Sequence, residues 1–556
     1  MTKQYQIIDL FSGAGGLSNG FEQTGYFSTV GAVELNIAAQ KTFIRNHGGR
    51  KELILKDKAS DTSDISKINF KDLQLNPRKT VIIGGPPCQG FSNANRQKNY
   101  LISGNNQLVK EYARAIRDIR PIAFLMENVK SIDSPVHKFF VTNFIENDEN
   151  DFSSKRHLDS ISSEEHDPLY KRDYIELLNF DSDSLRRIIS NYIELSDVPE
   201  PLINEPFLIS RIRTIERRIK SSDQIRLKGS KEQNEIKQIL SILSKSKKDL
   251  DMDLVITNAI EALGIILERS TSSGLIKDKI QDFIDLNRFL TRCKELKDEN
   301  IDCDKFSLVK DKLFKVHIGV YSYNVVEYLK RLFPYYGYSL DSGVLDASQF
   351  GVPQRRKRFM MLGIYQTKEK VTLPKPYSKQ VYTVRDAIYD LEDIEPQQDI
   401  ESYEESIYVN KNSNELIRYY REGIENKLLF DHINTKSSDL IQQRYKQILE
   451  SGGKNFHSLP DNMKESYKDA SRTQNTVYLR LNYDEPSPTV INVRKSMWQH
   501  PTKARALSIR EAARLQSFKD SFAFEGRKDE RYQQIGNAVP PKLANAVARK
   551  MLEYLE

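Results

Sequence analysis

Short apolar runs alternate with amphipathic, helix-length segments near both ends of the chain. Six of these runs predict buried strands: residues 5–10, 28–34, 80–83, 121–126, 338–346 and 359–364. A helix is expected over residues 17–24, after a glycine-rich turn. Strands separated by helical segments are typical of a parallel α/β sheet that helices cover on both faces. We therefore predict a doubly wound α/β fold.

The pattern changes between residues 131 and 316. Strand signals are few there, and apolar residues recur at helical spacing, as at Ile212, Ile215 and Ile219. This region is expected to be a mostly helical insert. Residues 391–480 are polar and irregular, which predicts a smaller mixed domain. The remaining residues are expected to form the α/β domain in three parts: 1–130, 317–390 and 481–556.

Charge is distributed unevenly along the chain. The 556 residues include 84 Lys and Arg against 77 Asp and Glu, a net charge of +7. Residues 131–310 hold 28 basic against 34 acidic residues, which leaves 56 against 43 on the rest. This flanking basic excess suits a polyanion partner, although ordinary solubility charge is the default explanation.

Neither a membrane protein nor a secreted one is predicted. No apolar run approaches the ~20 residues that cross a bilayer, and the N-terminal residues have neither a signal-peptide nor a transit-peptide pattern. The three cysteines, Cys88, Cys293 and Cys303, are too few for a disulfide framework. Because their spacing matches no common zinc site, no metal is expected. We expect a cytoplasmic protein.

The first candidate site is the segment Asp9-Leu-Phe-Ser-Gly-Ala-Gly-Gly-Leu17, with Glu34 at the end of the next strand. Glycines between a strand and a helix let backbone N–H groups approach a ligand, and an acidic residue one strand later can bind ribose hydroxyls. An adenosyl cofactor is predicted. The segment lacks the third glycine of the pyrophosphate fingerprint. A purely structural tight turn is the alternative.

Two further candidates follow strands that are expected to end at the same sheet edge. Cys88 lies in Gly84-Gly-Pro-Pro-Cys-Gln-Gly-Phe-Ser92, where open α/β sheets bind their ligands and prolines fix the path of the loop. We interpret Cys88 as a nucleophile; an inert buried thiol is the alternative. Glu127, expected just past a strand, could give a proton to a ring nitrogen. A solvated loop residue is the alternative there.

Six sequence blocks, in order, resemble the motif set of the DNA cytosine C5-methyltransferases. They are FSGAGGLS, GGPPCQGFS, ENV, QFGVPQRRKR, REAARLQSF and QIGNAVPP. The resemblance covers roughly residues 1–130 and 317–556, and the stretch between has no counterpart in compact members of the family. It implies a Rossmann-like methyltransferase sheet with a target-recognition domain at 391–480.

The resemblance also implies the chemistry. Cys88 would attack C6 of a cytosine that is flipped out of duplex DNA, and C5 would then take a methyl group from S-adenosylmethionine. Glu127 would engage N3 and the exocyclic amine. Arg358 would contact the cytosine carbonyl, and Arg356 would support the site, because guanidinium groups hold oxygen acceptors in a fixed geometry.

Binding residues follow from the same resemblance. Asp64 is the candidate contact to the adenine amine, with Asp61 as an alternative. The full set implied for the cofactor is Phe11, Gly13, Ala14, Gly15, Gly16, Leu17, Glu34, Asp64, Pro86, Asn537 and Val539. Residues 89–107 are expected to form a mobile lid that contacts DNA through Ser92, Arg96 and Lys98.

DNA recognition is expected in the mixed domain. Asp431, His432, Arg444 and the pair Gly452-Gly453 are candidates for DNA contact, with a structural role as the alternative for each. The insert could bind DNA, bind a partner protein or mediate self-association.

Three functions remain open on sequence alone. The leading one is a sequence-specific DNA cytosine C5-methyltransferase of a restriction-modification or related defence system, with duplex DNA and a cognate endonuclease or another defence protein as partners. The second is methylation of transfer RNA, which one branch of the same family performs. The third is a non-catalytic DNA-binding scaffold.

Overall fold

The computed structural model forms two compact units. The α/β unit comprises residues 1–92, 105–134 and 329–556, and the insert unit comprises residues 93–104 and 135–328. The residues described are 5–87, 105–134, 137–146, 148, 150–162, 168–246, 252–268, 271–377, 381–398, 414–424, 429–467 and 469–555. No helix in these ranges is both long enough and apolar enough to cross a bilayer.

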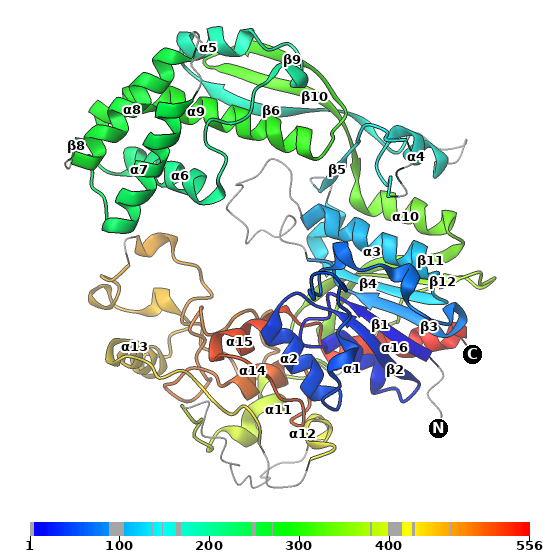
Figure 1. Ribbon diagram of the computed structural model, residues 1–556. Coiled ribbons are helices and arrows are strands. Elements are labelled where there is room, and N and C mark those ends of the chain that lie inside the picture. Colours follow the sequence, from blue (N-terminus) through cyan, green and yellow to red (C-terminus); the bar gives the residue numbers. More distant parts are fainter. Residues whose placement is uncertain are drawn as a thin grey trace. The chain divides into compact units, whose positions relative to one another are not determined.

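A six-stranded sheet forms the centre of the α/β unit (Figure 1). Its order is β11 (Tyr338–Asp346), β12 (Lys357–Tyr365), β4 (Ala123–Val129), β3 (Thr80–Gly84), β1 (Tyr5–Leu10) and β2 (Phe27–Val33). The predicted α/β sheet and all six predicted strands are confirmed. β12 alone runs antiparallel to its neighbours, because the link from β11 is too short for a parallel crossover.

Helices cover both faces of this sheet (Figure 1). On one face α1 (Gly16–Glu22) and α16 (Pro541–Leu555) pack over buried residues of β1, β3 and β12. They approach closely at Gly20, where a Cβ atom would lie 2.4 Å from the carbonyl oxygen of Pro541. On the other face Phe124 contacts Tyr112 of α3 (Asn105–Ile119) and Phe333 of α10 (Val325–Tyr335). α2 (Ile37–Asn46) follows β2.

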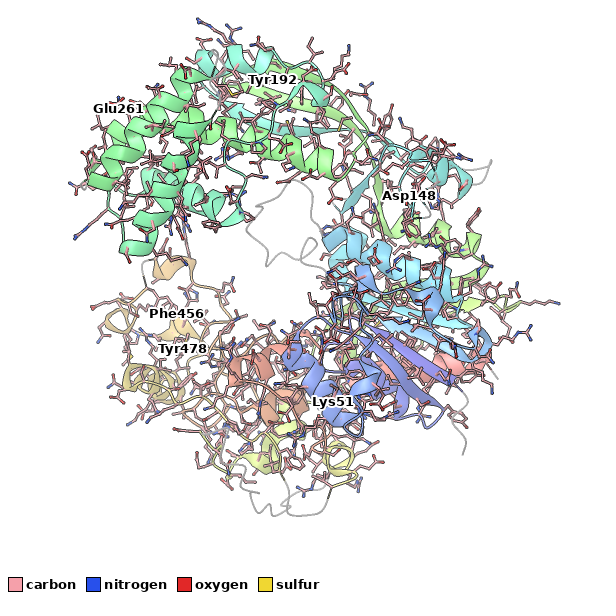
Figure 2. All side chains as sticks on the ribbon, in the orientation of Figure 1. Lys51, Asp148, Tyr192, Glu261, Phe456 and Tyr478 are labelled. Carbon is pink, nitrogen blue, oxygen red and sulfur yellow. The ribbon has the colours of Figure 1, made fainter. Side chains whose placement is uncertain are left out.

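The rest of the α/β unit holds short helices around two smaller cores. These helices are α11 (Val384–Ile388), α12 (Glu415–Arg421), α13 (Asp439–Glu450), α14 (Ile509–Leu515) and α15 (Lys528–Asn537). Tyr445 of α13 packs with Phe456 and Tyr478 in one of these cores. The rings of Phe456 and Tyr478, both labelled in Figure 2, are stacked with centroids 6.4 Å apart.

The insert unit contains the predicted helices and also a sheet that was not predicted. Its helices are α4 (Lys155–Ser160), α5 (Asp183–Ser190), α6 (Pro206–Ser221), α7 (Ser230–Lys245), α8 (Asp253–Glu268) and α9 (Ser273–Asp298). The antiparallel sheet joins β5 (Lys138–Phe140), β6 (Lys171–Phe180), β9 (Cys303–Lys310) and β10 (Phe314–Asn324), and β7 (Gln224–Ile225) pairs with β8 (Thr271–Ser272). β10 crosses the boundary expected at 316. Its alternating sequence, FKVHIGVY, was the available signal.

Candidate functional site

The turn between β1 and α1 is tied to the end of β2. The backbone N–H of Gly13 donates to Glu34 Oε2 at 2.8 Å, and Glu34 Oε1 accepts from the N–H of Asn36 at 2.7 Å. Gly13 and Gly15 have φ of 55° and 92°, in the left-handed region that favours glycine. A Cβ atom at Gly13 would meet no other atom within 4 Å, so the turn is open on that side.

Glu34 is a largely buried carboxyl group in this turn. Burial raises its pKa, and the backbone N–H groups of Asn36 and Gly13 oppose the rise. Its own N–H donates to Ser63 Oγ at 3.0 Å. Asp64 follows directly and accepts from Ser66, whereas Asp61 forms an ion pair with Lys56 at 3.0 Å. The segment that carries both acids is therefore tied to Glu34 through Ser63.

The block QIGNAVPP packs against the same turn. A Cβ atom at Gly16 would lie 2.5 Å from the carbonyl oxygen of Val539, so only glycine allows this approach. Asn537 is exposed, and its Oδ1 accepts from Gln533 at 2.8 Å. Of the other predicted cofactor residues, Phe11 is half-buried with φ of 58°, Ala14 and Leu17 are buried, and Pro86 is buried at the end of β3.

β3 and β4 meet beside the segment that leads to Cys88. The side-chain amide of Asn128 donates to the carbonyl of Pro86 at 3.0 Å. A Cβ atom at Gly85 would lie 2.6 Å from Glu127 Oε2, so this glycine lets the backbone approach the carboxyl group. Four predicted site residues lie outside the described residues: Cys88, Ser92, Arg96 and Lys98.

Glu127 and Arg358 form a largely buried ion pair between β4 and β12. Arg358 Nε lies 2.8 Å from Glu127 Oε1, and the two side chains are 14% and 12% exposed. The prediction that Glu127 follows the strand is wrong, because β4 continues to Val129. Arg358 opposes Val129 and Met360 opposes Glu127, so the pair is a diagonal contact on one face of the sheet. Burial raises the pKa of Glu127, while Arg358 and Arg356 lower it.

Arg356 is interior. Its guanidinium donates to the carbonyls of Val490 and Gly536, both at 2.9 Å. The neighbouring Gln354 is fully buried and donates to Gln516 Oε1 at 2.9 Å. These bonds join three of the sequence blocks around one core, so Arg356 is placed to position the site.

Two polar residues of the first candidate segment, Asp9 and Ser12, were given no individual role by the sequence reasoning. Asp9 is fully buried at the end of β1, and its burial raises the pKa to about 8. Its signal was an acid inside an otherwise apolar strand. Ser12 Oγ is buried and has no hydrogen-bond partner among the described residues.

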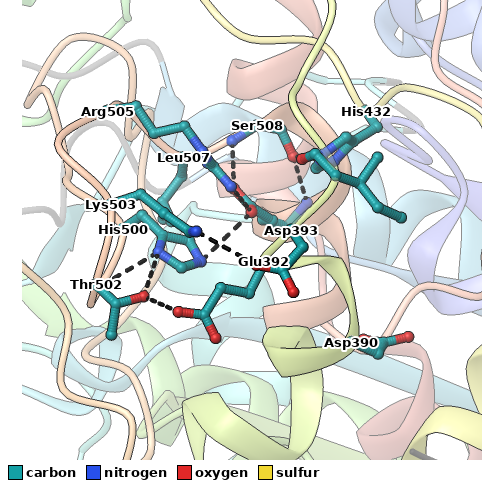
Figure 3. Close-up of polar contacts among 12 residues, drawn as sticks. Asp390, Glu392, Asp393, His432, His500, Thr502, Lys503, Arg505, Leu507 and Ser508 are labelled. Atoms are coloured by element: carbon teal, nitrogen blue, oxygen red, sulfur yellow. Dashed lines mark hydrogen bonds and ion pairs between the residues drawn. The ribbon is translucent and has the colours of Figure 1, made fainter. Parts of the chain in front are cut away.

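Three candidates for DNA contact are buried in this structure. The prediction that these three side chains contact DNA is therefore wrong. Asp431 pairs with Arg531 at 2.6 Å, and Arg444 donates to the carbonyl of Met463. His432 joins Ser508 at 3.0 Å in the polar cluster of Figure 3. In all three the side chain satisfies interior groups.

The turn after β1 has the chemistry that an adenosyl cofactor requires. Glu34 supplies a carboxylate at the end of β2, and the orphan hydroxyl of Ser12 and the open side of Gly13 lie in the turn itself. Carboxylate oxygens bind ribose hydroxyls, and glycine-rich turns accommodate the rest of such a ligand. The residues present therefore fit the group.

Comparisons with known proteins give the family. Curated relatives include the Type II methyltransferase M1.HphI of Haemophilus parahaemolyticus, 30% identical over 242 residues, covering 44% of this chain and 54% of the relative. M1.ScrFI of Lactococcus lactis subsp. cremoris is 32% identical over 210 residues, covering 36% and 46%. The chain thus spans about half the length of these relatives. DNA (cytosine-5)-methyltransferase 1B of Oryza sativa subsp. japonica is 28% identical over 270 residues, covering 40% and 17%.

A solved structure and a family model complete the comparison. A candidate DNA modification methyltransferase from an E. coli prophage covers 99% of both chains with 18% identity and a TM-score of 0.49. The family model for C-5 cytosine-specific DNA methylase matches residues 5–158 and 318–553, well over half of the chain. The chain therefore belongs to the C-5 cytosine-specific DNA methylase family.

Proposed function

We propose that this protein methylates C5 of a flipped-out cytosine in a specific duplex DNA sequence, with S-adenosylmethionine as the methyl donor. The observation that carries the proposal is the Glu127–Arg358 pair, which lies against Gly85 in the segment leading to Cys88. A carboxyl group with a raised pKa near the carboxyl end of β4 and its guanidinium partner on β12 suit a ring nitrogen and a carbonyl oxygen.

The proposed reaction begins at Cys88. Its thiolate adds to C6 of cytosine, and Glu127 gives a proton to N3, so that the ring becomes electron-rich at C5. Arg358 holds the carbonyl oxygen and keeps Glu127 in place through its Nε contact. After C5 has gained the methyl group, the C5 proton passes to a base, the Cys88 sulfur leaves C6 as a thiolate, and N3 returns its proton to Glu127, which restores the aromatic ring.

S-adenosylmethionine supplies the electrophilic methyl group when it is bound. We assign Glu34 to its ribose, the backbone of residues 13–17 to its methionine part, and Phe11 and Asp64 to its adenine. Asn537 and Val539 complete the pocket, which is supported by the packing of Val539 against Gly16. The assignments of Glu34, Phe11, Asp64 and Asn537 predict weaker cofactor binding when the side chain is removed.

The decisive experiment is methyl transfer from labelled S-adenosylmethionine to mixed-sequence duplex DNA, followed by base-resolution mapping of the products. We expect modified cytosines at one short sequence. Cys88→Ser should abolish turnover and the covalent adduct with 5-fluorocytosine DNA while it leaves cofactor affinity nearly unchanged. Cys303→Ser, in the insert unit, is the matched control and should leave both intact. Turnover by Cys88→Ser would overturn the nucleophile assignment.

We also propose a biological role in a restriction-modification system. Two of the relatives are named Type II methyltransferases, which supports this assignment. DNA modified by the protein should resist one endonuclease that cuts at the mapped sequence. Greater transfer to transfer RNA than to duplex DNA would overturn both the DNA substrate and this role.

A further inference from the structure

The insert unit carries many basic residues where α6 leads into α7. Residues 206–245 contain ten Lys and Arg against four Asp and Glu. The two helices pack against each other and lie beside α8 and α9 in Figure 1. The arrangement of these charges, more than their number, determines what the turn can bind.

The glutamates of this helix pair point inward. Glu232 accepts from Arg218 at 2.7 Å and from Arg211 at 2.8 Å, and Glu235 accepts from Arg211 at 2.6 Å. Glu216 binds Arg288 of α9 at 2.6 Å. Each of the three glutamate side chains is only 12% exposed. Three of the four acids are therefore neutralised inside the unit.

The same network fixes the turn. The second oxygen of Glu232 accepts from the backbone N–H of Lys228 at 2.7 Å, and Arg218 donates to the carbonyl of Arg226 at 3.2 Å. The hydrogen bond from Arg218 is the main reason why the pKa of Glu232 falls to about 2, so this carboxylate stays charged at neutral pH. The backbone of the turn is therefore held in one conformation.

Four other cations near the junction of α6 and α7 are exposed and have no acidic partner among the described residues. Arg217, Arg226, Lys228 and Lys231 are exposed, and none of the four has an ion pair within the part of the chain that the structure describes. Asp223 is the one exposed acid between α6 and α7. We name these four residues the basic turn. Its backbone is held by hydrogen bonds at Arg226 and Lys228, and its four side chains have no acidic partner among the described residues, which suits a surface that binds repeated negative charges.

We propose that the basic turn binds the phosphate backbone of duplex DNA outside the target sequence. The proposal rests on the proposed function, which makes duplex DNA the substrate. Charge complementarity supports DNA over an apolar partner, because the basic turn presents four cations and little apolar surface. Such contacts to phosphate strengthen binding without reading the sequence.

The test compares two triple variants of the full chain. The first variant changes the basic turn and carries Arg226→Glu, Lys228→Glu and Lys231→Glu. The second, the control variant, carries Lys171→Glu, Lys277→Glu and Lys312→Glu. These residues are exposed elsewhere in the insert unit, and the change in net charge is the same. Affinity for a fluorescent mixed-sequence duplex of about 30 base pairs is measured between about 50 and 200 mM KCl.

We expect the basic-turn variant to bind at least about tenfold more weakly than the control variant. The dependence of log affinity on log salt should also be shallower, by about 0.9 for each DNA phosphate that the variant no longer neutralises. Methyl transfer at saturating DNA should be unchanged, so KM for DNA rises and kcat does not. Equal affinity and slope for the two variants would overturn the inference and leave the proposed function standing. Failure of the unaltered protein to bind or methylate duplex DNA would overturn both.

Discussion

Two glutamate–arginine pairs in the α/β unit have nearly the same shortest N–O distance, but the pKa values of their carboxyl groups shift in opposite directions. Glu127 meets Arg358 at 2.8 Å and Glu511 meets Arg505 at 2.7 Å. Burial would raise the pKa of both carboxyl groups. The pKa of Glu127 is raised, whereas that of Glu511 is lowered. An arginine partner alone therefore does not determine the charge state of a buried glutamate.

The number of hydrogen-bond donors around each carboxyl group explains why the two pKa values shift in opposite directions. Glu511 accepts two hydrogen bonds from Arg505 and a third from the backbone N–H of Ser508, with His500 3.7 Å away. Within the described residues, Glu127 accepts one, from Arg358. Each donor favours the ionised form, so Glu511 stays charged in the interior. Fewer donors oppose the effect of burial at Glu127, so the pKa of its carboxyl group stays raised.

The largest effect is expected on activity, from Glu127→Gln. The amide keeps the shape and cannot give its proton to the base, so methyl transfer should fall about 10²- to 10⁴-fold. The free energy of unfolding should change by less than about 1 kcal/mol, because a neutral amide is favoured where burial already penalises the charge. Single-turnover methyl transfer and denaturant unfolding measure the two.

The exposed Glu369→Gln is the control for that substitution and should leave both quantities unchanged. If Glu127→Gln lowers the free energy of unfolding and leaves the rate of methyl transfer unchanged, Glu127 is a structural residue like Glu511. The comparison between the two pairs would then fail.

The second effect is on stability, from Glu511→Gln. Arg505 would be left buried without its counter-charge, which costs about 3–5 kcal/mol. Trp498, the only tryptophan of the chain, is 1% exposed in the same unit, so its fluorescence reports the unfolding of this part. Replacing both partners with Leu and Met should recover part of the loss. A cost under about 1 kcal/mol would show that the pair is not the interior support inferred from its donors.

The sequence predicted the strands and the residues of the Glu127–Arg358 pair, but it did not predict the contacts that bring them together. Apolar runs and glycine turns placed β1–β4 and the turn at Gly13, because local pattern determines buried strands. Motif resemblance brought Glu127 and Arg358 together as candidates. Their diagonal contact depends on the register of β4 against β12, and the packing of Gly85 on Glu127 depends on how the segment after β3 approaches β4. Neither follows from spacing along the chain.

Two other features could be recognised only once the fold was known. The sheet of the insert unit joins β6 and β10, which are separated by more than a hundred residues, so its pairing left no local signal. The sequence left open whether His432 and Arg444 contact DNA or have a structural role, because the partners of polar residues in an irregular segment are known only from the fold. In both cases long-range contacts outweigh the local pattern.

The third effect concerns pH and the histidine beside Glu511. Burial lowers the pKa of His500 from 6.5 to about 4, although Glu511 opposes the shift. The unfolded chain takes up a proton as the pH falls through about 6.5, while the folded chain resists until about 4. Stability should therefore decrease by roughly 2 kcal/mol between about pH 7 and pH 5. His500→Gln should flatten this slope in urea unfolding followed by Trp498 fluorescence; an unchanged slope would exclude His500 as its source.

The smallest effect tests a buried carboxyl group that has no arginine partner, that of Asp9. Burial raises its pKa to about 8, although hydrogen bonding from Ser18 opposes the rise. The folded protein therefore keeps this proton at neutral pH and releases it as the pH rises through about 8, whereas the unfolded chain has lost it near 4. Stability from this group should decline by about 1 kcal/mol between about pH 7 and pH 8.5. Asp9→Asn keeps a neutral side chain at every pH and should remove that decline in urea unfolding. If the decline persists in Asp9→Asn, Asp9 is ionised in the folded protein, and donors other than arginine must stabilise it as they stabilise Glu511.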